Sequence, residues 1–125
     1  MIRRNAQDVF ARLRTILRDH SGKLTVTADK PGYFCIAVAF SPKLGKGYPV
    51  AWAKIGKAYV SYHFMPVYMF PKLLEGVSKK LKARMQGKSC FNFTSVDEGL
   101  LAELELLTTE GLSAAVKAGF GPDRT

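Results

Sequence analysis

The side chains best suited to chemistry in this 125-residue chain are two cysteines and two histidines. Cys35, Cys90 and His63 lie in apolar, strand-like runs, where alternation would bring all three to one face of a sheet. A nucleophilic cysteine needs a base, usually histidine, within hydrogen-bond reach. The sequence offers no Asp or Asn signature to orient that imidazole, and no helix is expected directly after either cysteine to activate the thiol. We therefore expect two reduced, buried thiols, no catalytic site and no enzyme activity.

Metal binding is not indicated by the spacing of these residues. The cysteines and histidines form neither a Cys-x-x-Cys nor a His-x-x-x-His pattern, which argues against a zinc site. Glu98, Glu103 and Glu105 lie off the apolar stripe of a predicted helix, so we interpret them as its solvated side and not as paired carboxylates. The sequence thus predicts no metal and no cofactor.

A stretch from Val50 to Phe64 holds the only tryptophan. We interpret it as two strands joined by a two-residue turn at Gly56 and Lys57. That turn would pair Ile55 with Ala58, Ala53 with Val60, and Ala51 with Tyr62. Because paired residues share a face, one face is expected to pack against helices: Ala51, Ala53, Ile55, Ala58, Val60, Tyr62 and Phe64. The opposite face would carry Val50, Trp52, Lys54, Tyr59, Ser61 and His63, and a slip of one residue would exchange the two sets.

The second of these faces is the predicted binding surface, and its candidate ligand or interface residues are Tyr33, Trp52, Tyr59 and His63. Four interpretations stay open. The aromatic side chains would form a homodimer face to face, line a cleft for a small apolar or aromatic ligand, or stack on the bases of a single-stranded nucleic acid. In the fourth, the C-terminal helix covers this face and Trp52 belongs to the core.

Positive charge dominates the chain, because 19 Lys and Arg residues against 10 Asp and Glu give a formal net charge of +9. Such a charge attracts nucleic acid, anionic membranes or acidic partners, although it also serves solubility alone. The candidate basic patch comprises Lys54, Lys57, Lys79, Lys80, Lys82, Arg84 and Lys88. For the patch residues between 79 and 84, the alternative is the solvated side of a helix.

Length and composition predict a single domain over residues 1–125, with frayed ends at 1–5 and 120–125. No run approaches the roughly 20 apolar residues of a transmembrane helix. The arginines near the N-terminus are not followed by an apolar run, so a signal peptide is not expected. We therefore predict a cytoplasmic protein without membrane contact. The sequence does not name its partner, and a second copy of the chain and nucleic acid are the two candidates.

Hydrophobic periodicity predicts the elements of the first half. Residues 6–20 form a helix, strict alternation gives strands at 23–28 and 33–40, and two Pro and two Gly give a loop at 41–49. The inward-facing residues of these strands are expected to be Leu24, Val26, Ala28, Phe34, Ile36, Val38 and Phe40.

The second half of the sequence predicts one more strand, with helices before and after it in the chain. A helical region from Pro71 to Met85, broken at Gly76, precedes a strand at 88–94. A capping box at 95–98 then opens a C-terminal helix, which Gly111 would kink or break. This order favours an α+β fold, a two-layer sandwich in which an antiparallel sheet of about five strands packs against N-terminal, middle and C-terminal helices.

The residues from about Phe10 to Leu112 resemble the YdhG-like domains of unknown function, some of which are compared with frataxin-type iron chaperones. The resemblance is carried by Ala58-Tyr59-Val60-Ser61-Tyr62-His63-Phe64, by Lys80 to Met85 with the following Gly87-Lys88-Ser89-Cys90-Phe91-Asn92-Phe93, and by Asp97 to Leu107. It implies a frataxin-like sandwich and no established activity. Iron handling would need an acidic first helix, whereas Asp8 and Asp19 stand there among about five arginines.

The prediction from sequence is therefore a small intracellular binding or accessory domain, whose ligand or dimer surface lies on one sheet face. The alternative is a nucleic-acid-binding module that combines the basic surface with the sheet aromatics. An iron-handling chaperone is the third interpretation, and it rests on the family resemblance.

Overall fold

The protein is represented by a computed structural model, which describes residues 2–22, 24–41 and 43–120. Its elements are α1 (Ile2–Asp19), β1 (Thr25–Lys30), β2 (Tyr33–Ser41), β3 (Lys46–Ile55), β4 (Val60–Phe64), α2 (Met65–Met69), the 3₁₀ helix η1 (Pro71–Gly76), α3 (Lys79–Lys82), β5 (Met85–Gln86), β6 (Cys90–Phe93) and α4 (Glu98–Lys117). Within these residues, six strands form one antiparallel sheet in the order β1-β2-β3-β4-β6-β5.

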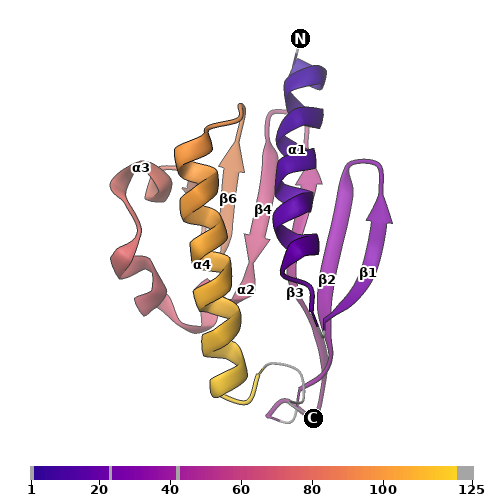
Figure 1. The fold of residues 1–125 in the computed structure, drawn as a ribbon, viewed down its shortest axis with the longest axis vertical. Coiled ribbons are helices and arrows are strands. Elements are labelled where there is room, and N and C mark those ends of the chain that lie inside the picture. Colours follow the sequence, from indigo (N-terminus) through magenta and orange to yellow (C-terminus); the bar gives the residue numbers. More distant parts are fainter. Residues whose placement is uncertain (1, 23, 42, 121–125) are drawn as a thin grey trace.

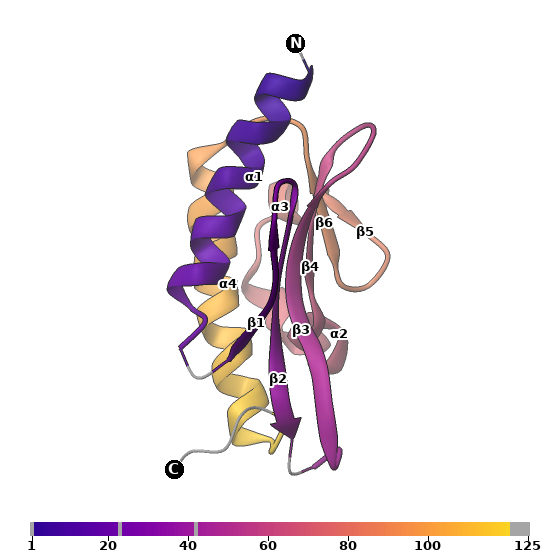
Figure 2. The ribbon, with the colours of Figure 1, turned by 90° about the vertical axis from the view of Figure 1, so that its right-hand side faces the viewer.

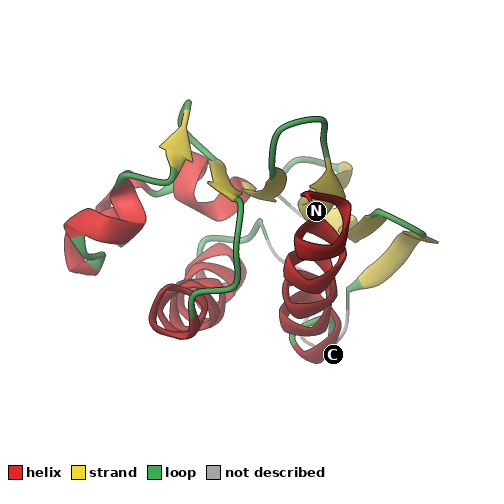
Figure 3. Ribbon diagram, turned by 90° about the horizontal axis from the view of Figure 1, so that it is seen from above, coloured by secondary structure: helices red, strands yellow, loops and turns green. Residues whose placement is uncertain are grey.

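The molecule has two layers, because the long helices α1 and α4 lie over the same face of the sheet (Figures 1 and 2). Seen from above, the segment with η1 and α3 lies at the end of the sheet away from β1 (Figure 3). We call the face away from α1 and α4 the open face, since no other long helix of the described residues covers it. The predicted α+β two-layer sandwich is confirmed, with six strands in place of about five.

Alanines at the centre of the sheet bring the helices close. Ala51 and Ala53 of β3 are completely buried on the core face, where α1 packs against β3. Apolar side chains of both helices fill the space between the layers: Val9, Phe10, Leu13, Ile16 and Leu17 from α1, and Leu100, Leu101, Leu104 and Leu107 from α4. This burial is the main stabilising contribution of the fold. The first helix begins at Ile2, so residues 2–5, where we expected a frayed end, are helical; Met1 and residues 121–125 lie outside the described residues.

The predicted register of the β3–β4 hairpin is wrong by two residues. Ala51 pairs with Phe64, Ala53 with Tyr62, and Ile55 with Val60. The connection therefore spans residues 56–59, and its Gly56 amide donates to the Tyr59 carbonyl over 2.9 Å. Because side chains alternate with a period of two, this shift by itself moves no strand residue to the other face. Ala58, predicted in the second strand, lies exposed in the turn instead.

Bulges move several other residues to the face opposite to the predicted one. The β2–β3 register shifts between Ile36 and Ala37, and Val50, predicted on the binding face, is completely buried in the core. Residues 46–49 are strand rather than loop, and the end of β2 turns Phe40 outward, where it is 56% exposed. A bulge in β1 likewise separates Val26 from Ala28, which pairs with Cys35.

Strand β1 is an edge strand, and α1 packs mainly against β2, β3 and β4. Val26 is therefore exposed although it was predicted to be buried. In the middle of the chain, the expected break at Gly76 is confirmed, since η1 ends there and α3 starts at Lys79. Met85, predicted as the last residue of the helical region, starts strand β5 instead.

Helix α4 is continuous through Gly111, contrary to the expected kink or break. Asp97, and not Ser95, caps it, because its carboxylate accepts a hydrogen bond from the Leu100 amide over 3.1 Å. Gly111 is buried in the helix, where an added Cβ would collide with the ring of Phe64. Glycine therefore serves close helix–sheet packing here and does not end the helix.

Candidate functional site: the open face of the sheet

Two neighbouring rows of side chains cross the open face from strand to strand. The first row is Cys35–Trp52–His63–Cys90–Gln86, and the second is Tyr33–Lys54–Ser61–Asn92. The members come from β2, β3, β4, β6 and β5, so residues distant in sequence are brought together by register alone. The candidate residues Tyr33, Trp52 and His63 lie in these rows as predicted.

Trp52 and His63 form the centre of the first row. Their rings are stacked, with centroids 4.7 Å apart and planes 14° from parallel. This separation matches the spacing of neighbouring strands, so the rings stand side by side on the sheet. Both side chains are half-buried. The alternative that the C-terminal helix covers Trp52 is wrong, because α4 packs against the opposite, core face.

A chain of polar contacts continues the first row across β4, β6 and β5. The Tyr59 hydroxyl donates to Gln86 Oε1 over 2.9 Å, and the Asn92 side-chain amide donates to the same oxygen over 2.8 Å. The Cys90 thiol donates to Asn92 Oδ1 over 3.3 Å and lies 3.7 Å from His63 Nε2. The candidate residue Tyr59, the last residue of the β3–β4 turn, is therefore fixed at the rim of the same face.

The Cys90–His63 pair is electrostatically unsuited to nucleophilic attack. Burial raises the pKa of the Cys90 thiol, which favours the neutral thiol. Burial, and then the neighbouring Lys54 ammonium, lower the pKa of His63, which favours the neutral imidazole. The arrangement opposes the thiolate–imidazolium pair that activated cysteines use. Cys90 is half-buried rather than fully buried as predicted, whereas Cys35 is buried, and both thiols are free.

The residues of the predicted basic patch do not form one group. Lys54 lies in the second row, and Lys57 lies in the β3–β4 turn. Arg84 is next to Asn92, whose amide donates to its carbonyl over 2.8 Å, and Lys88 lies in the β5–β6 turn. Only these four are within or beside the rows.

The other patch residues, Lys79, Lys80 and Lys82, belong to α3, which packs against α4. Lys80 forms an ion pair with Asp97 over 3.2 Å. This segment is thus separate from the open face. Its position agrees with the alternative interpretation, in which these lysines form the solvated side of a helix.

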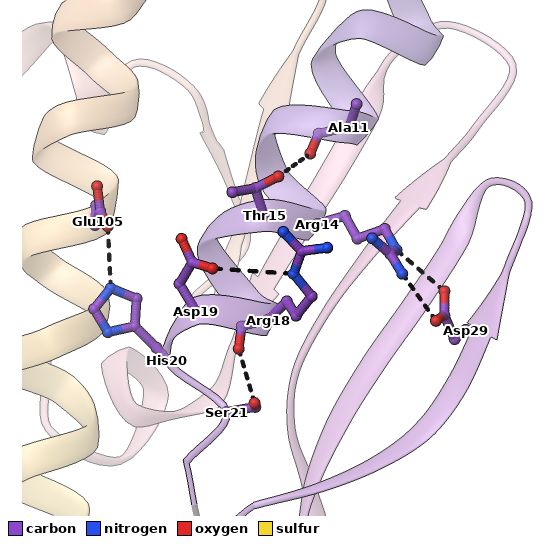
Figure 4. A network of polar contacts seen from close by, with 9 residues as sticks. All are labelled: Ala11, Arg14, Thr15, Arg18, Asp19, His20, Ser21, Asp29 and Glu105. Carbon is purple, nitrogen blue, oxygen red and sulfur yellow. Dashed lines mark hydrogen bonds and ion pairs between the residues drawn. The ribbon is translucent and has the colours of Figure 1, made fainter.

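Acidic side chains are concentrated on the helical side of the protein. In the described part of the chain, every Asp and Glu lies on α1, η1 or α4 or caps α4, except Asp29 of β1. Asp29 also faces the helices, where Arg14 of α1 binds it through two hydrogen bonds of 3.1 and 2.9 Å (Figure 4). The two rows of the open face therefore contain a lysine and no carboxylate.

Gln86 and Asn92 were not placed on this face from the sequence, and Ser61 was placed on it but was not among the four candidate ligand residues. The alternation that points Phe91 and Phe93 inward also points Asn92 outward. The position of Asn92 on the open face could therefore have been predicted from the sequence. Gln86 lies in the two-residue strand β5, which is too short to show a periodicity.

The structure was also searched for metal ligands and for membrane-spanning helices. The described residues contain no group of three or more His, Cys, Asp or Glu side chains placed to hold a metal ion. Among the helices that the structure describes, none is long and apolar enough to span a bilayer.

No protein-family model matches the chain, and no match is found among curated proteins or solved structures. The similarity to YdhG-like and frataxin-type proteins consequently stays a prediction from sequence.

Proposed function

We propose that the protein binds single-stranded nucleic acid on the open face of its sheet. The observation that carries the proposal is the combination of an uncovered Trp52–His63 stack with a face whose rows hold Lys54 and no carboxylate. Sequence-tolerant binding of single strands uses this combination, because every base has a face that stacks on an aromatic ring and every nucleotide carries a phosphate.

The rows provide groups for both parts of a nucleotide. Tyr33, Trp52 and His63 offer aromatic surface, and the side chains of Ser61 and Asn92 offer hydrogen-bonding groups for base edges. Lys57, Arg84 and Lys88 border the same face from two turns and the β5 edge, at positions suited to phosphates. The net charge of +9 adds long-range attraction for a polyanion.

Charge also favours nucleic acid over a face-to-face homodimer. Two copies of this surface would bring lysines and arginines of the same sign together, without carboxylates in the rows to compensate them. Like charges facing each other across an interface oppose association. A single-stranded nucleic acid supplies the missing negative charge.

Fluorescence anisotropy of a labelled oligothymidine tests this function. We expect binding at low salt with a negative dependence of log affinity on log salt concentration. Trp52→Leu should weaken binding by about 1–3 kcal/mol, the usual contribution of one stacked base. The control Tyr68→Leu removes an exposed aromatic ring on α2, outside the two rows, and should leave affinity unchanged.

Two results would contradict the proposal. One is the absence of binding even at low salt, or binding that Trp52→Leu leaves intact. The other is a dimer in sedimentation that Trp52→Lys converts to a monomer, because the face would then be a protein interface.

A further inference from the structure

A cavity of about 220 Å³ lies on the helical side of the sheet, away from the open face. It is bordered by the C-terminal end of α1, the last turns of α4 and strands β2 and β3. Helix α1 ends at Asp19, whereas α4 and the β2–β3 hairpin continue well past that level (Figure 1). The missing helical turns leave space between the two layers.

The walls of this cavity are almost entirely apolar. Val38 and Val50 line it from the sheet, and Leu112 and Ala115 line it from α4. Val50 can line the cavity because the β2–β3 bulge turns its side chain to the core face. At the end of α1 the lining residue Gly22 has no side chain that could fill the space.

Polar groups at the rim already have partners inside the protein. His20 Nε2 lies 3.3 Å from Glu105 Oε2, and the Ser21 hydroxyl donates to the Arg18 carbonyl over 2.8 Å (Figure 4). The Tyr48 hydroxyl donates to the Phe120 carbonyl over 2.9 Å. None of the described residues that line the cavity is an Asp, Glu, Lys or Arg, so these residues offer no permanent charge to a charged ligand.

We propose that this cavity binds a compact, uncharged apolar molecule with the size of a one- or two-ring aromatic compound. A dry, apolar cavity of about 150 Å³ accepts benzene in a protein core, and this cavity is somewhat larger. The volume is below the roughly 300 Å³ at which pockets for larger ligands begin. The site is independent of the open face and does not require nucleic-acid binding.

Indole and n-octanol serve as probes in a titration followed by methyl resonances of the protein. Indole is expected to give saturable shifts of the Val38, Val50 and Leu112 methyl groups and to raise the melting temperature. Octanol, a linear chain, is expected to shift them less. Ala115→Leu should occupy the cavity, remove the saturable shifts and keep or raise the melting temperature.

The matched control is Ala102→Leu, which adds the same atoms at an exposed position of α4 and should leave indole binding intact. A second filling variant, Leu112→Phe, tests the cavity from another wall if Ala115→Leu does not fold. The proposal is overturned if indole gives no saturable shift in the wild type, if either folded filling variant binds indole as the wild type does, or if octanol binds more tightly than indole.

Discussion

The hydroxyl oxygens of Tyr62 and Thr108 lie 2.6 Å apart across the core and join the centre of the sheet to α4. Thr108 donates its own proton to the Leu104 carbonyl over 2.8 Å, so Tyr62 is the donor in the contact between the two hydroxyls. Both side chains are completely buried. The two groups satisfy each other in a place that water does not reach.

Removing the Thr108 hydroxyl alone should cost more unfolding free energy than removing both hydroxyls of this pair. Thr108→Val leaves the buried Tyr62 hydroxyl without an acceptor, which costs about 1–3 kcal/mol of unfolding free energy. Tyr62→Phe should cost less, because Thr108 keeps its bond to Leu104. The double variant should recover part of the Thr108→Val loss, and urea unfolding of all four proteins measures this coupling. Strict additivity of the two single losses would contradict the shared hydrogen bond.

Burial of Tyr62 also predicts sensitivity to alkali. Burial raises the pKa of Tyr62 above the ordinary value for tyrosine, since the phenolate would be ionised inside the core. The folded state therefore holds this proton more tightly than the unfolded state does. The associated stability is fully present below about pH 10 and falls as the pH rises above it.

Tyr62→Phe should accordingly flatten the loss of stability above pH 10 in urea unfolding. Some loss will persist, because burial also raises the pKa of Tyr33 and Tyr48. The exposed Tyr68→Phe variant is the control and should keep the wild-type profile. A Tyr62→Phe profile parallel to the wild type would exclude this residue as a cause.

Gly111 offers a test of the helix–sheet distance. In Gly111→Ala, the added Cβ meets the buried Phe64 ring and lies 3.0 Å from Pro66 Cβ. Overpacking costs about 1–3 kcal/mol, against a helix-propensity gain of about 1 kcal/mol, so we expect net destabilisation in urea unfolding. Gly99→Ala, in the first turn of the same helix, meets only an ordinary contact of 3.5 Å and should not destabilise. Equal stability of both variants would mean that the helix can move away from the sheet.

The hydrophobic pattern predicts which face of the β3–β4 hairpin is buried but not how its strands are aligned. The two-residue turn would place Trp52 opposite Ser61, whereas the structure places it opposite His63. Both alignments bury Ala53 and Tyr62, so burial cannot distinguish them. The aromatic face was therefore predictable from the sequence, and the Trp52–His63 stack was not.

Bulges set the second limit on prediction from this sequence. Val50 and Ala28 change face because one extra residue enters a strand, and alternation carries no signal for such an insertion. Tyr59 and Asn92 both donate hydrogen bonds to Gln86, which lies in the two-residue strand β5. These contacts could be predicted only if that short strand were recognised in the sequence. Local patterns thus predict the layers of this fold, while the details of the site depend on pairings between distant segments.

The salt dependence of oligonucleotide binding should identify the cations that contact phosphates. Lys54→Gln and Lys57→Gln should each reduce the slope of log affinity against log salt by about 0.7, as expected for one lost contact with a single strand. Lys117→Gln, in the last turn of α4, is the control and should leave the slope unchanged. Equal effects of all three variants would point to diffuse attraction by net charge in place of a defined face.

Because of His63, we expect the free energy of unfolding to decrease in mild acid. Its pKa is lowered first by burial and second by the Lys54 ammonium, so the folded state disfavours the imidazolium relative to the unfolded state. The stability contribution is present above the ordinary histidine pKa of about 6.5 and is lost as the pH falls through the lowered pKa of His63 in the folded protein. His63→Gln should remove this component from urea unfolding between pH 8 and pH 5.

In an NMR titration, Lys54→Gln should raise the pKa of the His63 imidazole only part of the way, because burial is the larger cause. A His63 pKa that Lys54→Gln leaves unchanged would show that the two side chains of the open face do not interact.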